Sequence, residues 1–255
     1  MSKAETYPLR RGIVYGPVRS RRLGFSLGIN LFPEGHKICP FNCVYCEYGC
    51  TTDLVSRAGR DELPTVDEVL GAVERGLVET PALQYVTFSG HGEPTLHPDF
   101  AHIVDGVLAC RDRLQAQARV AVLSCSGVVN RPEVRAVLDH LDERIMKLDA
   151  GDEATFQAIN RPVPGLALES IVAGLASLED IVIQHMVLDG RISNLHGAAR
   201  KAWLAAVQRI GPSEIQIYSV DRPTAESGVL KVPGDVMTRL ANEIQQLTGV
   251  PTSAY

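Results

Sequence analysis

The chain has 255 residues, of which 45% are hydrophobic and 22% charged, so it is long enough to bury one sizeable core. No apolar run approaches the roughly 20 residues of a membrane helix, and no apolar stretch follows residues 1–5 that would serve as a signal peptide. The net charge of −5 argues against an indiscriminate nucleic-acid binder, because the phosphate backbone is bound mainly by Lys and Arg.

Basic residues nevertheless gather near the N-terminus. Five arginines fall within thirteen residues with no acid among them: Arg10, Arg11, Arg19, Arg21 and Arg22. Because arginine presents a planar fork of donors, such a segment could hold a carboxylate, a phosphate or an RNA backbone. We predict an N-terminal arm over residues 1–25 in which Arg19, Arg21 and Arg22 bind substrate. A solvated surface hairpin is the alternative.

Beyond this arm, the hydrophobic pattern alternates between strand and helix. The expected strands are residues 26–32, 84–89, 119–125, 144–149, 180–188 and 214–220, and the expected helices are residues 65–79, 98–115, 131–141, 166–178, 194–210 and 234–248. Such alternation favours parallel strands joined by right-handed helical crossovers. The pattern therefore predicts an α/β fold, either a partial barrel or an open doubly wound sheet.

Three of the six cysteines, Cys39, Cys43 and Cys46, have the spacing C-x3-C-x2-C. Three thiolates this close can bind one face of an iron–sulfur cube, whose fourth iron is then left without a protein ligand and can take an exogenous one. The clustering also suits a reducing compartment, where thiols bind metals rather than form disulfides. We therefore expect a cytoplasmic protein with a metal centre.

The cysteine spacing admits two other interpretations. Three structural cysteines on one helix are rejected, because Pro33, Gly35 and Pro40 surround the first thiol and disfavour a helix there. A closed zinc site needs a fourth ligand, which His36 or Cys50 could supply. A non-catalytic, zinc-stabilised binding protein is therefore an alternative.

Polar and glycine-rich residues follow the predicted strands. In parallel α/β folds the active site gathers at the carboxyl ends of the strands. The polar and glycine-rich residues at or near the carboxyl ends of the predicted strands are 89–94, 124–127, 147–151, 184–185 and 216–222. A zinc module gives no reason for this pattern, so it favours an enzyme.

Several motifs together resemble the wyosine-synthase-related group of the radical S-adenosylmethionine (SAM) superfamily. They are residues 16–24, the cysteine loop followed by Glu47-Tyr48-Gly49, and residues 88–97, 147–152 and 220–223. The resemblance covers about residues 11–255. It implies a single radical SAM domain over residues 1–255, built as a partial (β/α)6 TIM-like barrel. The arm would be residues 1–25, the barrel core 26–220, and a C-terminal loop and helix 221–255.

The resemblance also implies the metal and cofactor ligands. Cys39, Cys43 and Cys46 would ligate three irons of a 4Fe-4S cluster, and Tyr45 would pack beside the adenine of SAM. Further contacts to SAM would come from Gly90, Gly92, Glu93, Lys147, Asp149 and Gln184.

Each of these further groups has an implied contact. The two glycines and Glu93 match the superfamily's Gly-Gly-Glu-Pro turn, with His91 inserted, and would receive SAM's ammonium group. Asp149 would accept from the ribose hydroxyls, and Lys147 or Gln184 would meet SAM's carboxylate. For these last three residues a solvated loop or a helix cap is the alternative. His91 and His97 are left unassigned.

Cys125 follows a predicted strand, where its thiol could give a hydrogen atom to a substrate radical. A buried cysteine that only packs is the competing interpretation.

The resemblance implies an enzyme that takes one electron from reduced flavodoxin or ferredoxin and cleaves SAM reductively. The 5′-deoxyadenosyl radical would abstract hydrogen from a small-molecule or peptide substrate. A wyosine-like tRNA-modifying enzyme is the alternative, which the acidic charge disfavours.

Overall fold

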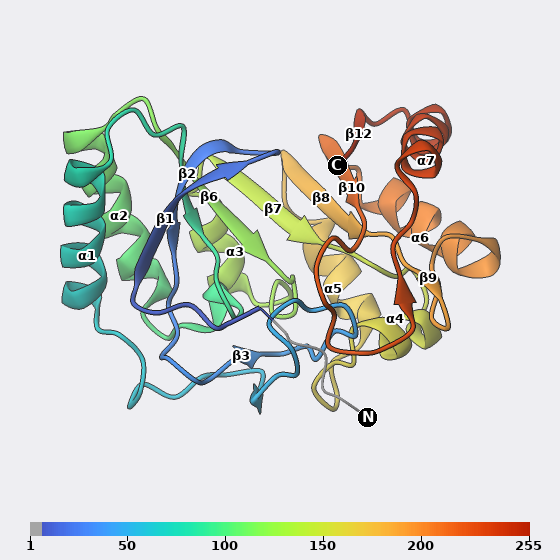
Figure 1. The fold of residues 1–255 in the computed structure, drawn as a ribbon, viewed down its shortest axis with the longest axis horizontal. Helices are drawn as coiled ribbons and strands as arrows, with labels where there is room; N and C mark the ends of the chain where they lie inside the picture. Colours follow the sequence, from blue (N-terminus) through green and yellow to red (C-terminus); the bar gives the residue numbers. More distant parts are fainter. Residues whose placement is uncertain (1–6) are drawn as a thin grey trace.

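The computed structural model describes residues 7–255, in which eight strands form one sheet with the order β1-β2-β5-β6-β7-β8-β10-β12 (Figure 1). β1 runs antiparallel to β2, and every other neighbouring pair in the sheet is parallel. The strands are β1 (Val14–Ser20), β2 (Gly24–Ile29), β5 (Tyr85–Phe88), β6 (Arg119–Ser124), β7 (Glu143–Lys147), β8 (Ile181–Met186), β10 (Glu214–Tyr218) and β12 (Thr252–Ala254). The predicted α/β fold with parallel strands is confirmed.

Helices follow the parallel strands, as the sequence pattern indicates. They are α1 (Val66–Glu79), the 3-10 helix η1 (Pro94–Leu96), α2 (Phe100–Leu114), α3 (Pro132–Leu138), α4 (Glu153–Ile159), α5 (Leu168–Leu175), α6 (Gly197–Ile210) and α7 (Gly234–Thr248). In Figure 1, α1 and α2 lie at the β1–β2 end of the sheet, and α6 and α7 lie at the β10–β12 end. Two small sheets pair β3 (Ile38–Cys39) with β4 (Asp53–Leu54) and β9 (Asp189–Gly190) with β11 (Val229–Leu230).

The strands have apolar side chains on both faces because both faces are covered. In β8, Ile181 and Ile183 point to one face and Val182 to the other, and all three side chains are buried. This is the pattern of parallel strands between helices and a filled interior.

The turn between β1 and β2 packs on other strands of the sheet. Leu23 is buried in this turn against Ile145 of β7 and Val182 of β8. Its neighbour Arg21 forms an ion pair with Asp221, which follows β10, at 2.6 Å. The β1–β2 hairpin therefore contacts strands from the far half of the sheet.

The predicted arm is not confirmed as a separate element. Residues 14–20 form a strand of the main sheet, and Leu23 in the turn that follows packs on its interior. Residues 1–6 of the expected arm lie outside the described residues. Within residues 7–255, no helix has the length and apolar character that crossing a bilayer requires.

Candidate active site

A cavity of about 410 Å³ lies at the carboxyl ends of the strands. The cysteine loop contributes Cys39, Cys43 and Cys46, and the glycine-rich turn after β5 contributes Gly90 and Gly92. The remaining lining includes Arg21, Arg22, Cys125, Lys147, Gln184 and Tyr218. The fold therefore brings together residues as far apart in the chain as Arg21 and Tyr218.

Backbone hydrogen bonds hold the cysteine loop from several sides. Val44 donates its N–H to the carbonyl of Ile159 at 3.0 Å and accepts from Glu226 N at 3.0 Å, while Val55 N donates to the Cys39 carbonyl at 3.2 Å. Because these partners come from distant parts of the chain, the position of the loop depends on the whole fold.

A buried lysine lies beside the thiols. Lys37 is 4% exposed and donates from Nζ to the Gly49 carbonyl at 2.7 Å. Burial alone would lower its pKa, but the neighbouring thiols of Cys46, Cys39 and Cys43 raise the pKa above its ordinary value. The Lys37 ammonium group can therefore compensate negative charge on the neighbouring cysteine thiolates.

The donor set fits a 4Fe-4S cube. Three soft sulfur ligands face one cavity, and in a cube each would bind a different iron. Among residues 7–255, no three His, Cys, Asp or Glu side chains are arranged around one position for a single metal ion. His36 instead contacts Asp53 at the surface, with 3.1 Å between Nδ1 and Oδ2, and the exposed Cys50 is outside the cavity lining.

Tyr45 and Asp149 are linked behind the cavity surface. The Tyr45 hydroxyl donates to Asp149 Oδ2 at 2.5 Å, and Asn160 Nδ2 donates to the same oxygen at 2.9 Å. Met186 N donates to Asp149 Oδ1 at 2.8 Å. Asp149 is 2% exposed and does not line the large cavity, so its contact with the SAM ribose stays a prediction.

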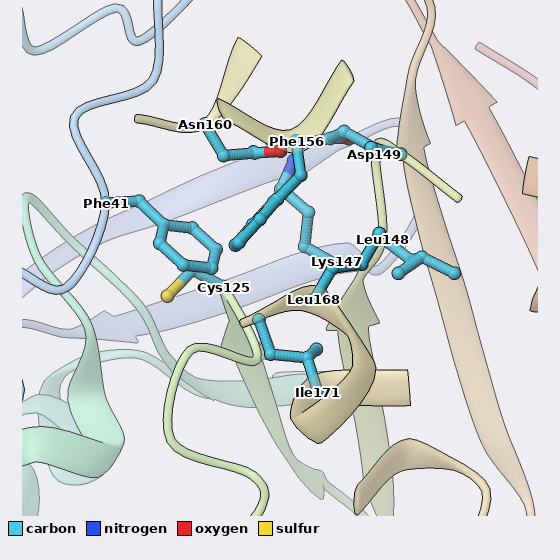
Figure 2. Close-up of a pocket in the computed structure, with 10 residues that line it drawn as sticks. Phe41, Cys125, Lys147, Leu148, Asp149, Phe156, Asn160, Leu168 and Ile171 are labelled. Carbon is cyan, nitrogen blue, oxygen red and sulfur yellow. Dashed lines mark hydrogen bonds between the residues drawn. The ribbon is translucent and has the colours of Figure 1, made fainter. Parts of the chain in front are cut away.

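Asp149 and Asn160 face a second, much smaller cavity of about 10 Å³ (Figure 2). Figure 2 shows Phe41 and Phe156 beside them, with Cys125 near Phe41. Asn160 Nδ2 also lies 3.4 Å from the Cys43 Sγ atom. Asn160, which the sequence analysis missed, therefore joins the cysteine loop to the end of β7.

The turn after β5 packs tightly against the start of the cysteine loop. A Cβ at Gly92 would lie 2.5 Å from the Ile38 carbonyl oxygen. Gly90 has a φ of +122°, and a Cβ there would lie 2.5 Å from Asn30. Both positions therefore require glycine, and both line the cavity as the motif predicts.

Glu93 is fully buried and its carboxylate accepts hydrogen bonds within the protein. Oε1 accepts from Thr95 N at 3.1 Å, from Thr95 Oγ1 at 2.6 Å and from Ser124 Oγ at 2.9 Å, and Oε2 accepts from Cys125 N at 2.5 Å. Glu93 thus caps η1 and fixes the end of β6. It is not a lining residue of the cavity, and its contact with SAM stays a prediction.

The two histidines near this turn hold loop backbone. His91 accepts from Arg10 N at Nδ1 and contacts the Pro33 carbonyl through Nε2, both at 3.0 Å. Burial lowers the pKa of His91, so Nε2–H of the neutral ring donates to Pro33. His97 bridges Asp99 N and the Pro64 carbonyl in the same way.

Cys125 lines both cavities and shares the lining of the larger one with Cys39. Burial raises the pKa of Cys125 well above its ordinary value, and the neighbouring Cys39 adds to this. The thiol therefore stays protonated beside a candidate cluster ligand. Its role as a hydrogen donor stays a prediction.

Lys147 at the end of β7 and Gln184 within β8 line the cavity, and their contact with SAM stays a prediction. Lys147 Nζ donates to the hydroxyl of Tyr218, at the end of β10. Burial would lower the pKa of Lys147, but Tyr218 and Asp149 raise it above its ordinary value. Tyr218 falls within residues 216–222, which the sequence places at a strand end without a specific role.

The three predicted substrate arginines have different surroundings. Arg21 and Arg22 line the cavity, whereas Arg19 is exposed on β1 and does not. A further arginine, Arg222, lines the cavity and pairs with Glu47 at 2.6 Å. The sequence signal for Arg222 was its position just after a predicted strand.

Comparisons with known proteins identify relatives of this chain. UPF0026 protein slr1464 from Synechocystis is 32% identical over 216 residues, covering 82% of this chain and 76% of the relative. UPF0026 protein MJ1312 from Methanocaldococcus jannaschii is 29% identical, with 93% and 72% covered. GTPase Obg from Brachyspira hyodysenteriae is 28% identical over 83% of this chain, which spans only 30% of the length of that protein.

Solved structures with low sequence identity share the fold. A structure of TYW1 with a lysine-pyruvate adduct bound has a TM-score of 0.60 at 16% identity, covering 87% of this chain and 73% of that one. Native anSMEcpe with bound AdoMet also has a TM-score of 0.60, at 15% identity, with 90% and 63% covered. The family model of the radical SAM superfamily matches residues 35–190. This chain therefore belongs to the radical SAM superfamily, whose enzymes bind a 4Fe-4S cluster and SAM.

Proposed function

We propose that this radical SAM enzyme uses Cys39, Cys43 and Cys46 as cluster ligands and abstracts a hydrogen atom from a small-molecule or peptide substrate. The observation that carries this proposal is the convergence of the three thiols, the glycine turn and the polar strand ends on one cavity. When bound, the cluster and SAM together supply an electron and a 5′-deoxyadenosyl radical. We propose reduced flavodoxin or ferredoxin as the electron donor.

The chain's own residues would orient SAM and exclude water. Tyr45, held by Asp149, would pack beside the adenine, and the backbone at Gly90 and Gly92 would receive the ammonium group. Lys147 or Gln184 would meet the carboxylate. Residues 1–255 would act as one domain, with the loop and helix at 221–255 covering the β10 end of the barrel.

The cluster assignment is tested by replacing each cysteine of the loop. Cys39→Ala, Cys43→Ala and Cys46→Ala should each abolish iron loading and 5′-deoxyadenosine formation, because two thiolates do not hold the cube firmly. Iron and sulfide analysis after anaerobic reconstitution, with electron paramagnetic resonance of the reduced protein, measures the loading.

Cys110→Ala on α2 and the exposed Cys50→Ala provide matched controls, since neither residue lines the cavity. Both controls should keep the cluster. Loss of iron from Cys50→Ala with retention in Cys39→Ala would mean that the ligand set is wrong.

A further inference from the structure

Part of the large cavity carries hydrogen-bond donors that the described protein does not satisfy. Arg22 Nη1 is buried and has no hydrogen-bond partner among residues 7–255. The same holds for Nε2 of Gln184, a residue that is 5% exposed. Both residues line the cavity, Arg22 from the β1–β2 turn and Gln184 from β8. A buried donor without an acceptor costs free energy, which a ligand acceptor would recover.

Tyr218 adds a third donor at this place. Because the Lys147 ammonium donates to the Tyr218 oxygen, that bond leaves the phenolic hydrogen free to be donated to another acceptor. The Arg22 guanidinium carbon lies 4.9 Å from the centre of the Tyr218 ring, and Lys147 Nζ lies 4.7 Å from it. Two cations therefore adjoin one tyrosine.

These two cations differ from the other arginines of the cavity. Arg21 is paired with Asp221 and Arg222 with Glu47, each at 2.6 Å. Within residues 7–255, neither Arg22 nor Lys147 has a carboxylate within 4.0 Å of its charged nitrogen atoms. The positive charge around Tyr218 is thus not neutralised by a direct ion pair in the part of the chain that the structure describes.

A surface that offers donors and positive charge requires a ligand that accepts hydrogen bonds and carries negative charge. We infer that Arg22 and Tyr218, with the Tyr218 hydroxyl oriented by Lys147, bind an oxyanion of a small-molecule substrate beside SAM. The oxyanion is a carboxylate or a phosphate. This inference rests on the proposed function, and it selects Arg22 from the three predicted arginines.

The burial of Arg22 Nη1 favours a small molecule over a folded RNA. Because Arg22 lines the cavity, a small ligand held within the cavity can approach its guanidinium group. A backbone phosphate on the surface of a large RNA would instead meet the exposed Arg19. The carboxylate of SAM is the second source of the same chemistry, and the experiment separates the two.

The experiment is calorimetric titration of malonate and of inorganic phosphate into the anaerobically reconstituted enzyme at saturating SAM. At least one of the two anions should bind with one-to-one stoichiometry. Arg22→Gln should weaken this binding about tenfold or more, because a charge-assisted hydrogen bond is lost. Tyr218→Phe, which keeps the ring and removes only the hydroxyl, should weaken it severalfold. SAM affinity and iron content should equal those of the unmodified enzyme in both variants.

Arg239→Gln is the control, since Arg239 lies on α7 and pairs with Asp235 at 2.8 Å outside the cavity. This variant should bind the anion normally. Absence of binding by either anion, or unchanged binding by Arg22→Gln, would overturn the inference.

Two other results would also overturn the inference, because each would show that a different ligand binds at this site. Competition between malonate and SAM, with weaker SAM binding by Arg22→Gln, would assign the site to the SAM carboxylate. Binding of bulk tRNA but of neither small anion, with a steep salt dependence that Arg22→Gln removes, would assign it to RNA. Failure of the unmodified protein to load iron or bind SAM would instead refute the proposed function.

Discussion

At the scale of single residues, Glu93 combines a motif position with a structural role. Its carboxylate accepts hydrogen bonds from the backbone of Thr95 and Cys125 and from the Thr95 and Ser124 hydroxyls. Because the side chain is fully buried, water cannot replace it as the acceptor. The carboxylate thereby joins the turn that lines the cavity to the end of β6.

We expect Glu93→Ala to lower the free energy of unfolding by about 3 kcal/mol, since buried donors lose their acceptor. Glu93→Gln, which keeps one acceptor oxygen, should be less severe. Urea unfolding of the reconstituted protein measures the loss, and calorimetry measures SAM affinity in parallel. Unchanged stability with a ten- to hundredfold weaker SAM affinity would show instead that Glu93 contacts SAM directly.

The site could be predicted from sequence where the chemistry is local. The cysteine spacing and the two glycines lie within short motifs, and the structure brings them to one cavity. The burial of Glu93 and Asp149 could not be predicted, because their partners Ser124, Asn160 and Met186 are distant in the chain. A motif specifies which residue is present but not which neighbours the fold gives it.

At the scale of elements, the β1–β2 hairpin carries the arginines that the sequence analysis placed on a separate arm. Leu23 packs inside the sheet on β7 and β8, and the neighbouring Arg21 and Arg22 line the cavity. The positions of Arg21 and Arg22 therefore depend on the apolar contact that Leu23 makes one or two residues further along the chain.

We expect Leu23→Ala to lower the free energy of unfolding by about 2–4 kcal/mol, because it leaves a void between the turn and the sheet. Val18→Ala on the same hairpin should cost much less, since Val18 is 38% exposed. Urea unfolding curves of the two variants make the comparison. Equal effects would mean that the turn does not pack on the sheet.

Elements with a clear period were predictable, and some of the short ones were missed. The predicted helix at residues 234–248 coincides with α7, and the helix at 65–79 differs from α1 only by its N-cap Thr65. α4, with seven residues, was missed, whereas α3 of the same length lies within the helix predicted at residues 131–141. β1 was assigned to the arm because its residues are mostly exposed and include Gly16 and Pro17.

At the scale of the whole molecule, buried histidines link stability to pH. His185 of β8 stacks on Trp203 of α6 with 4.1 Å between ring centres, and its Nδ1 lies 3.1 Å from the Leu148 carbonyl oxygen. Burial lowers the pKa of His185 to about 4. The folded state therefore holds a neutral ring at a pH where the unfolded chain binds a proton.

Because the folded pKa lies below the unfolded value of about 6.5, the stability from His185 is complete above pH 6.5. It decreases as the pH falls from 6.5 towards 4, by about 3 kcal/mol in total. His185→Phe, which preserves ring stacking, should flatten this dependence in urea unfolding between pH 7 and pH 4.5.

The exposed His102 on α2 is the control, and His102→Phe should leave the slope unchanged. A residual slope is expected in His185→Phe, because burial also lowers the pKa of His91 and His97. A slope identical to that of the unmodified protein would contradict the assignment to His185.

The contact between the Asn160 amide and the Cys43 sulfur bears on electron transfer. Hydrogen bonds to ligand sulfurs are among the factors that set the reduction potential of an iron–sulfur cluster. With Cys43 as the proposed cluster ligand, an N–H directed at its Sγ would stabilise the added negative charge of the reduced form. Because the same amide is held by Asp149, which follows β7, the position of β7 would influence the reduction potential of the cluster. A shift of β7 on ligand binding would therefore change how readily the cluster accepts an electron.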